Sequence, residues 1–304
     1  MKAVRFTEYG DADVLNVVDV PRPAPGPDQL LVRVRAAGIN PGEGKIRSGA
    51  ARARFPATFP SGEGSDLAGT VAEIGPGTTG VAVGEEVVGW TDNRASHAEY
   101  ALVEAENWTP KPDSVPWDVA GAIPVAGFTA YAAVRAVALR SGDVLVVSGA
   151  AGGVGSIAVQ LATLQGAAVI GLASEPNHEW LSNLGVTPVS YGDGVADRIR
   201  QVADHVDAFV DTHGGDYVDL ALALGVEPSR IDTIANFTAP QEHGVKADGN
   251  AAGASAATLA KLLGLIVDGN LEIPIAASYP LAEVGDAYRE LERGHTRGKI
   301  VLLP

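Results

Sequence analysis

The feature that most constrains this sequence is a glycine-rich segment that directly follows a short apolar run. Val144–Val147 is wholly apolar, which is typical of a strand buried on both faces of a parallel sheet. Residues 149–155 then read Gly-Ala-Ala-Gly-Gly-Val-Gly. A helical pattern follows, carried by Ile157, Leu161 and Leu164. A strand, a glycine turn and a helix in this order form the context of a dinucleotide-binding fingerprint.

The fingerprint here reads A-x-G-x-x-G, with alanine in place of the first glycine. Glycines let the backbone approach a pyrophosphate closely, and the N-terminus of the helix offers N–H groups and a partial positive charge. The alternative is a tight turn that binds nothing, but the strand and helix around the loop favour a cofactor site. The predicted phosphate-binding residues are Ala150, Gly152, Gly153, Val154 and Gly155.

The rest of the chain predicts an α/β protein with two kinds of domain. Candidate strands begin near residues 144, 168, 189, 208 and 231, a spacing of about 20 residues that is typical of repeated strand–helix units. Right-handed crossovers between them give a doubly wound parallel sheet, the Rossmann arrangement. The first hundred residues instead show short strands at 14–20, 30–35, 69–74 and 100–103 between Pro- and Gly-rich turns, which indicates a β-barrel-like domain.

The last third of the chain shows two helices, a strand and a loop. One helix is carried by Leu259, Leu262, Leu263 and Ile266, and another by Val284, Ala287, Tyr288 and Leu291. Residues 299–303 form a closing strand, and 236–255 are expected to form a long loop.

The end of the second candidate strand bears on the choice of cofactor. Proteins selective for NAD place an acid there to bind the 2′-hydroxyl of the ribose, whereas this chain has Ala173 and Ser174, with Glu175 one step beyond. Without an acid at the strand end, the main repulsion against a 2′-phosphate is absent, so NADPH is favoured. Ser174, His178 and Tyr191 are the predicted contacts of the phosphate, although His178 is equally open to being a solvated helix residue.

Composition excludes several other classes. The chain has no cysteine, so disulfides, thiolate metal sites and a catalytic cysteine are ruled out. The net charge of −15 disfavours nucleic acid and anionic membranes as partners. Every apolar stretch is interrupted by Gly, Pro or polar residues, and no signal peptide is recognised, so we expect a cytoplasmic protein without a membrane span.

Several motifs along the whole chain together match one family. These are Gly38-Ile39-Asn40-Pro41 with Arg47-Ser48-Gly49, Asp66–Val71, Gly84–Gly89, His97–Tyr100, Gly127–Ala130, Asp211–Gly215 and Gly298–Leu302. With them, the chain resembles the zinc-independent quinone oxidoreductases of the medium-chain dehydrogenase/reductase superfamily, the group that includes zeta-crystallin.

The resemblance implies a domain layout and a site. A GroES-like catalytic domain would span residues 1–117, with a C-terminal return at 256–304, and a Rossmann NADPH-binding domain would span 118–255. NADPH would lie in a cleft between the two domains, with its nicotinamide near Asn40 and Thr129. Lys45 would contact substrate because it is close to Asn40, and Asn236 is assigned to cofactor binding. Pairing of Rossmann sheets through an edge strand would give a homodimer.

Related zinc alcohol dehydrogenases carry metal ligands that this chain lacks. They have cysteine at the position of Asn40 and histidine at that of Ser65, so no metal site is expected. Lys45 and Ala51 also stand where several quinone reductases have tyrosine, which predicts a wider and less aromatic substrate pocket.

The predicted activity is hydride transfer from NADPH to a quinone or to an activated alkene (an α,β-unsaturated carbonyl). The alternative is an NADPH-binding redox sensor or structural protein of the crystallin type, without turnover. His97 would donate a proton if it faced the cleft and is otherwise a loop residue before a strand. Asp66 is expected to hold an internal hydrogen bond or ion pair.

Overall fold

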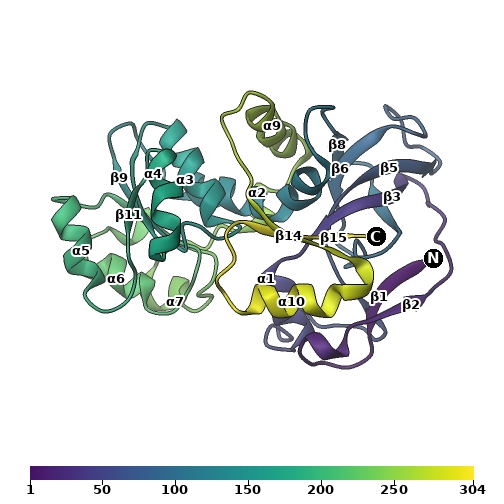
Figure 1. The fold of residues 1–304 in the computed structure, drawn as a ribbon, viewed down its shortest axis with the longest axis horizontal. Helices are drawn as coiled ribbons and strands as arrows, with labels where there is room; N and C mark the ends of the chain where they lie inside the picture. The colour runs from purple at the N-terminus through teal and green to yellow at the C-terminus, as the bar shows by residue number, and fades with distance from the viewer. The chain divides into compact units, whose positions relative to one another are not determined.

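The computed structural model describes residues 1–304, which divide into two compact units (Figure 1). The first unit comprises Met1–Val125, Ser255–Val267 and Ile273–Pro304, and the second comprises Ala126–Ala254 and Asp268–Glu272. Residue 117, where the sequence analysis ended the first domain, is the first residue of helix α2 (Trp117–Ala136), and α2 contributes residues to both units.

The second unit contains a five-stranded parallel sheet in the order β11-β10-β9-β12-β13. This is the doubly wound Rossmann order that the strand–helix spacing predicted. The strand order reverses beside β9, and such a reversal places a crevice outside the carboxyl ends of the neighbouring strands. The strands are β9 (Val144–Ser148), β10 (Ala168–Leu172), β11 (Thr187–Val189), β12 (Ala208–Asp211) and β13 (Ile231–Thr233).

Helices connect these strands on both faces of the sheet, as Figure 1 shows for α3 and α4 on one side and α5 and α6 on the other. Val146, Phe209 and Ile231 are fully buried in the core between sheet and helices. The predicted helix after the glycine turn is confirmed as α3, in which Ile157 and Leu161 are buried and Leu164, its last residue, is 48% exposed. The helices are α3 (Gly155–Leu164), α4 (His178–Asn183), α5 (Val195–Val202) and α6 (Tyr217–Ala223), with 3-10 turns η2 (Glu175–Asn177) and η3 (Pro228–Arg230).

The predicted loop at 236–255 was also wrong in part, because it contains two short helices, α7 (Ala239–His243) and α8 (Asn250–Gly253). The side-chain carbonyl of Asn236 accepts hydrogen bonds from the backbone N–H groups of Thr238 and Ala239, both at 3.2 Å, and so orders the start of α7. Gly244, with φ of +70°, ends α7. Helices this short show no apolar periodicity, so the sequence pattern did not reveal them.

The first unit is built on two sheets. A seven-stranded sheet has the order β14-β15-β3-β5-β6-β8, with β7 also paired to β3, and a small sheet has the order β2-β1-β4. The predicted short strands of the first hundred residues are therefore present. The strands are β1 (Lys2–Phe6), β2 (Asn16–Asp19), β3 (Gln29–Gly38), β4 (Ser61–Gly62), β5 (Asp66–Ile74), β6 (Glu86–Trp90), β7 (Tyr100–Glu104), β8 (Trp108–Pro110), β14 (Ile275–Pro280) and β15 (Lys299–Leu303).

Three helices and two 3-10 turns complete this unit: α1 (Pro41–Arg47), α9 (Ala256–Val267), α10 (Val284–Glu292), η1 (Ala12–Val14) and η4 (Leu281–Glu283). Both predicted helices of the last third are confirmed, with Leu259, Leu262 and Leu263 buried on α9 and Tyr288 fully buried on α10. Strand β15 lies between β14 and β3, so the closing strand is internal to the sheet.

By length and composition, helix α2 contradicts the expectation that no apolar stretch is long enough to span a membrane. Its 20 residues meet that test of length and composition, and the helix continues through Pro124. In the folded chain, however, 78% of the relevant window is buried inside the protein. A buried core helix passes the same test, so α2 is weak evidence for a membrane span.

Candidate functional site

The glycine-rich segment forms a tight turn between β9 and α3. Gly149 takes a positive φ of +59°, a conformation that side chains other than glycine rarely adopt. The N–H of Ala150 donates to the carbonyl of Leu172 at 3.0 Å, which ties the turn to β10. The turn therefore lies at the carboxyl edge of the parallel sheet, next to the point where the strand order reverses.

Two glycines of the turn have different surroundings. A Cβ added at Gly155 would lie 2.1 Å from the carbonyl oxygen of Gly149, so a side chain there would break the packing of α3 against the turn. A Cβ added at Gly152 would meet only the same oxygen, at 3.2 Å, and no other heavy atom within 4 Å. Gly155 is thus required by the fold, whereas the space beside Gly152 is open.

Two backbone donors of the turn point to an anion as its ligand. The N–H groups of Gly153 and Val154 donate no hydrogen bond within the chain. They precede the first residue of α3, a ten-residue helix whose N-terminus carries a partial positive charge. Open space, unpaired N–H groups and a helix N-terminus together fit the pyrophosphate of a dinucleotide.

The structure brings Ser174 and His178 together in the turn after β10. His178 Nε2 lies 3.3 Å from the carbonyl oxygen of Ala173. Asn177, which the sequence analysis did not select, donates from Nδ2 to Ser174 Oγ at 3.1 Å. No acidic side chain occupies the strand end itself, because Ala173 is there and is buried. Tyr191 follows β11, and its ring is 46% exposed.

Asn236 lies after β13 and is used in the local turn described above. Its Oδ1 accepts a third hydrogen bond, from Thr238 Oγ1 at 3.1 Å. The structure thus gives this predicted cofactor residue a structural role in starting α7.

A buried aspartate connects three strand ends at this edge. Asp211 Oδ1 accepts from Ser148 Oγ at 2.6 Å and from the backbone N–H of Gly214 at 2.9 Å. Its Oδ2 accepts from Thr233 Oγ1 at 2.7 Å. The ends of β9, β12 and β13 are thereby linked. Asp211–Gly215 is one of the motifs that carry the family resemblance, but its sequence alone does not reveal that Asp211 links these strand ends.

Asn40 is the N-cap residue of helix α1 in the first unit, and both polar atoms of its side chain form hydrogen bonds. Asn40 Nδ2 donates to Asp66 Oδ2 at 3.0 Å and to Glu43 Oε1 at 3.3 Å. Asn40 Oδ1 accepts from Lys299 Nζ at 2.5 Å. Asp66 also accepts from the N–H of Val125 at 2.7 Å, so the predicted internal hydrogen bond of Asp66 is confirmed. The amide of Asn40 is thus fixed in one orientation.

The same interior contains further charged and polar groups. Glu43 Oε2 accepts from the hydroxyl of Tyr288 at 2.6 Å. Arg47 forms an ion pair with Glu63 at 2.7 Å between two side chains that are each 1% exposed. Arg47 also pairs with Glu292 at 2.7 Å, and its guanidinium lies 4.3 Å from the ring centroid of Tyr288.

Burial dominates the electrostatics of these groups. It raises the pKa of Asp66 to about 6, against the opposing charge of Lys299. Burial, followed by the neighbouring charge of Glu43, raises the pKa of Glu63 to about 8 in spite of Arg47. Burial also raises the pKa of Tyr288 well above its ordinary value. A carboxyl of this cluster therefore retains its proton at pH values where an exposed one is ionised.

His97 belongs to this interior as well. It has no exposed surface, and its Nε2 lies 3.2 Å from the carbonyl oxygen of Gly38. Burial lowers its pKa and disfavours the imidazolium form. The structure confirms the alternative that His97 is a loop residue before a strand, since it lies between β6 and β7, and it adds that the side chain is fully buried.

The other two predicted catalytic residues differ in setting. Lys45 lines a hollow of about 310 Å³ between α1 and α10, together with Ser48, Tyr288 and Leu291. Thr129 lies on α2 in the second unit and is 6% exposed.

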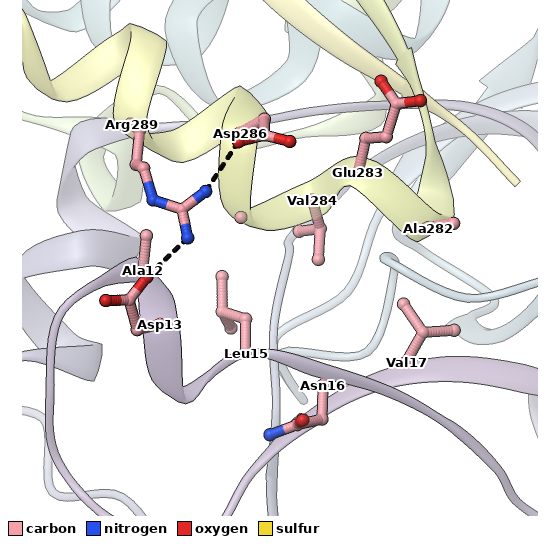
Figure 2. A pocket seen from close by; sticks show the side chains of 11 residues that line it. Ala12, Asp13, Leu15, Asn16, Val17, Ala282, Glu283, Val284, Asp286 and Arg289 are labelled. Carbon is pink, nitrogen blue, oxygen red and sulfur yellow. Dashed lines mark hydrogen bonds and ion pairs between the residues drawn. The ribbon is translucent and has the colours of Figure 1, made fainter.

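A second hollow of about 440 Å³ lies between Ala12–Val17 and Ala282–Arg289, as Figure 2 shows. Arg289 forms ion pairs there with Asp13 and Asp286. None of the predicted site residues lines this hollow, and its one cation is already paired with two carboxylates, so we assign it no function.

The donors near Asn40 do not fit a zinc ion. In this chain, Asn40 and Ser65 stand where zinc dehydrogenases have cysteine and histidine. The side-chain amide of Asn40 is already hydrogen-bonded to Asp66 and Lys299. No group of three or more His, Cys, Asp or Glu side chains in the chain is arranged to hold a metal ion.

Two family models match the chain. The model described as "Alcohol dehydrogenase GroES-like domain" matches residues 26–141, and the model described as "Zinc-binding dehydrogenase" matches residues 184–302. The fold, the glycine turn and these matches define the class: the chain belongs to the medium-chain dehydrogenase/reductase superfamily.

Relatives narrow the family further. The quinone oxidoreductase of Pseudomonas aeruginosa is 30% identical over 327 residues, which cover 100% of this chain and 99% of that protein. The chloroplastic NADPH-dependent alkenal/one oxidoreductase of Arabidopsis thaliana is 29% identical over 320 residues, which cover 100% of this chain and 80% of that protein. The solved structure of the quinone oxidoreductase from Coxiella burnetii is 31% identical, with a TM-score of 0.90 and coverage of 100% and 99%. The chain belongs to the quinone oxidoreductase family, as its motifs predicted.

Proposed function

We propose that this protein is an NADPH-dependent reductase of quinones or of activated alkenes. The observation that carries the proposal is the turn at 149–155, where space beside Gly152 and unpaired N–H groups of Gly153 and Val154 precede helix α3. The relatives named for quinone and for alkenal/one reduction support the choice of substrate class.

The protein's part in this reaction is to bind and orient. Gly153 and Val154 would donate to the pyrophosphate, and Asp211 would hold the ends of β9 and β12 at the edge where the cofactor lies. When bound, NADPH supplies a hydride from its nicotinamide ring, and the acceptor takes up a proton to complete the reduction. No step through zinc is proposed, because the residues at Asn40 and Ser65 do not fit that ion.

We propose NADPH rather than NADH because no acid ends β10. Ala173 stands at that position, and Ser174 and Asn177 present polar groups in the turn that follows. His178 and Tyr191 are the further proposed contacts of the 2′-phosphate. Introducing an acid by Ala173→Asp is expected to shift the preference toward NADH, as measured by fluorescence titration of both cofactors.

Asn40, Lys45 and Thr129 are the proposed residues beside the nicotinamide and the substrate. Lys45→Ala is expected to raise KM for the acceptor more than it lowers kcat, because a side chain lining a hollow contributes mainly to binding.

The decisive assay is loss of NADPH absorbance with a panel of quinones and enones. Turnover with members of either group supports the proposal. Tight NADPH binding without turnover on any of them would instead indicate a redox sensor or structural protein.

We also propose a cytoplasmic homodimer. The Rossmann sheet ends at β11 on one side, where no further strand pairs with it, whereas the outer edge of β13 is buried and hydrogen-bonded to Lys246. An unpaired sheet edge such as that of β11 favours pairing with a second copy. The net charge of −15 gives the protein little attraction to anionic lipid. Light scattering would refute the dimer by giving the mass of one chain, 31.1 kDa, at micromolar concentration, and cell fractionation tests the location.

A further inference from the structure

Arg198 on helix α5 holds together the loop that follows β11. Its Nε donates to the carbonyl of Ser190 at 2.9 Å, and its Nη1 donates to that of Asp193 at 2.7 Å. Its Nη2 donates to the carbonyls of Tyr191 and Gly192, both at 3.1 Å. All four acceptors are backbone carbonyls, and Arg198 forms no ion pair with a carboxylate. Its guanidinium therefore has no carboxylate partner within ion-pair distance.

The position of this charge follows from the pairing of two strands. Leu172 of β10 is in register with Val189 of β11, and the N–H of Ala173 donates to the carbonyl of Val189 at 3.1 Å. Ser190, which Arg198 binds, is the next residue after Val189. Since neighbouring strands are about 4.8 Å apart, Ser190 lies near the end of β10 that leads into Ser174, and the guanidinium of Arg198 is bonded to the carbonyl of Ser190.

The residues predicted to contact the 2′-phosphate lack a permanent positive charge. Ser174 and Tyr191 are neutral at pH 7, and His178 is charged only when protonated. A phosphate monoester carries close to two negative charges, and a guanidinium is the side chain best suited to bind it. Three of the four hydrogen bonds of Arg198 are exposed to solvent, and one of the five guanidinium N–H groups, on Nη1, is not used in the loop. The group could therefore offer a ligand one hydrogen bond together with its positive charge.

We propose that Arg198 determines the cofactor preference of this protein, by supplying the positive charge that selects a 2′-phosphate over a 2′-hydroxyl. The same residue orders the loop that carries Tyr191. This inference rests on the proposed NADPH dependence and names the residue responsible for it.

Arg200 offers a matched control on the same helix. It lies two residues farther along α5, about 200° around the helix axis. Arg200 pairs with Asp197 at 3.2 Å and donates to the carbonyl of Ala223 at 3.4 Å, so its charge is compensated away from the β11 loop. Arg200→Gln removes the same charge from the chain as Arg198→Gln.

The test compares the dissociation constants of NADPH and NADH, titrated by fluorescence, for the parent and three variants. Arg198→Gln is expected to weaken NADPH binding by about tenfold or more while NADH changes by less than about twofold, since only NADPH carries the phosphate. Arg198→Lys retains the charge and is expected to keep most of the preference. Arg200→Gln is expected to leave the ratio of the two constants unchanged.

Three results would overturn the assignment. If Arg198→Gln weakened the binding of NADPH and of NADH by the same factor, Arg198 would only order the loop. The thermal midpoint of the variant is measured in parallel. An unchanged ratio of the NADPH and NADH dissociation constants in Arg198→Gln would mean that the 2′-phosphate is bound elsewhere. If Arg198→Lys lost as much of the preference for NADPH as Arg198→Gln, the positive charge would be excluded as the cause of that preference. A parent that binds neither cofactor would refute the proposed function itself, a result distinct from these.

Discussion

Replacing Gly152 by valine is expected to abolish tight cofactor binding and to leave the fold intact. The fold should survive because an added Cβ meets only the carbonyl oxygen of Gly149, at 3.2 Å, and because the φ of Gly152 is outside the left-handed region. The valine side chain would instead occupy the open space beside the unpaired N–H groups of Gly153 and Val154.

The magnitude follows from those two donors. Each hydrogen bond to a charged phosphate contributes about 1.5–3 kcal/mol, so loss of both costs about 3–6 kcal/mol. At 1.4 kcal/mol for each factor of ten, the dissociation constant of NADPH should rise roughly 10²- to 10⁴-fold.

Fluorescence titration of NADPH measures the first half of this prediction, and circular dichroism with thermal melting measures the second. Gly264→Val is the control, because Gly264 lies on α9 in the other unit and an added Cβ there meets nothing within 4 Å. A Gly152→Val protein that folds and binds NADPH as tightly as the parent would show that this turn does not hold the phosphates, and the central assignment would fail.

Three further predictions concern stability. Gly155→Ala should lower the thermal midpoint by the equivalent of about 1–3 kcal/mol or more, because the new Cβ would lie 2.1 Å from the oxygen of Gly149; an unchanged midpoint contradicts this. Burial raises the pKa of Asp232 to about 7, so the stability that its proton confers is present below about pH 4 and is lost as the pH rises through 7. The thermal midpoint should therefore be lower at pH 8.5 than at pH 5.5, and Asp232→Asn should reduce that difference. Lys299→Met should lower the free energy of unfolding in urea by about 2–6 kcal/mol, because the buried carbonyl of Ile39 and Oδ1 of Asn40 each lose their donor, at about 1–3 kcal/mol for each unsatisfied acceptor. Asp66, whose pKa is already raised to about 6, takes up a proton when the opposing charge of Lys299 is removed, and a loss below about 1 kcal/mol would argue against these hydrogen bonds.

The Rossmann sheet and the glycine turn could be predicted because their signals are local. The central strands β9 and β10 are short apolar runs, and the fingerprint lies within seven consecutive residues, 149–155. The helices α9 and α10 were found for the same reason, since their apolar residues recur at helical spacing.

What the sequence did not reveal depends on contacts between distant residues. Asn40 and Lys299 are 259 residues apart, and nothing in either neighbourhood indicates that they form a hydrogen bond. His97 was correctly placed in the loop before β7, but no pattern in the sequence showed that its side chain is fully buried. The role of Arg198 was missed because its partners are backbone carbonyls, which every residue type possesses.

The internal position of β15 has a consequence for synthesis of the chain. Lys299 at the start of β15 binds the carbonyl of Ile39, 260 residues earlier, and β15 pairs directly with β3. On the ribosome, the second unit has all its residues once Glu272 has emerged, whereas Ala37 and Gly38 at the end of β3 must wait for their partners Leu302 and Val301. An unpaired strand edge is a template for wrong partners, and this end of β3 stays unpaired until β15 is made, although β7 covers Gln29–Arg33 much earlier. We therefore expect the second unit to complete its fold before the first.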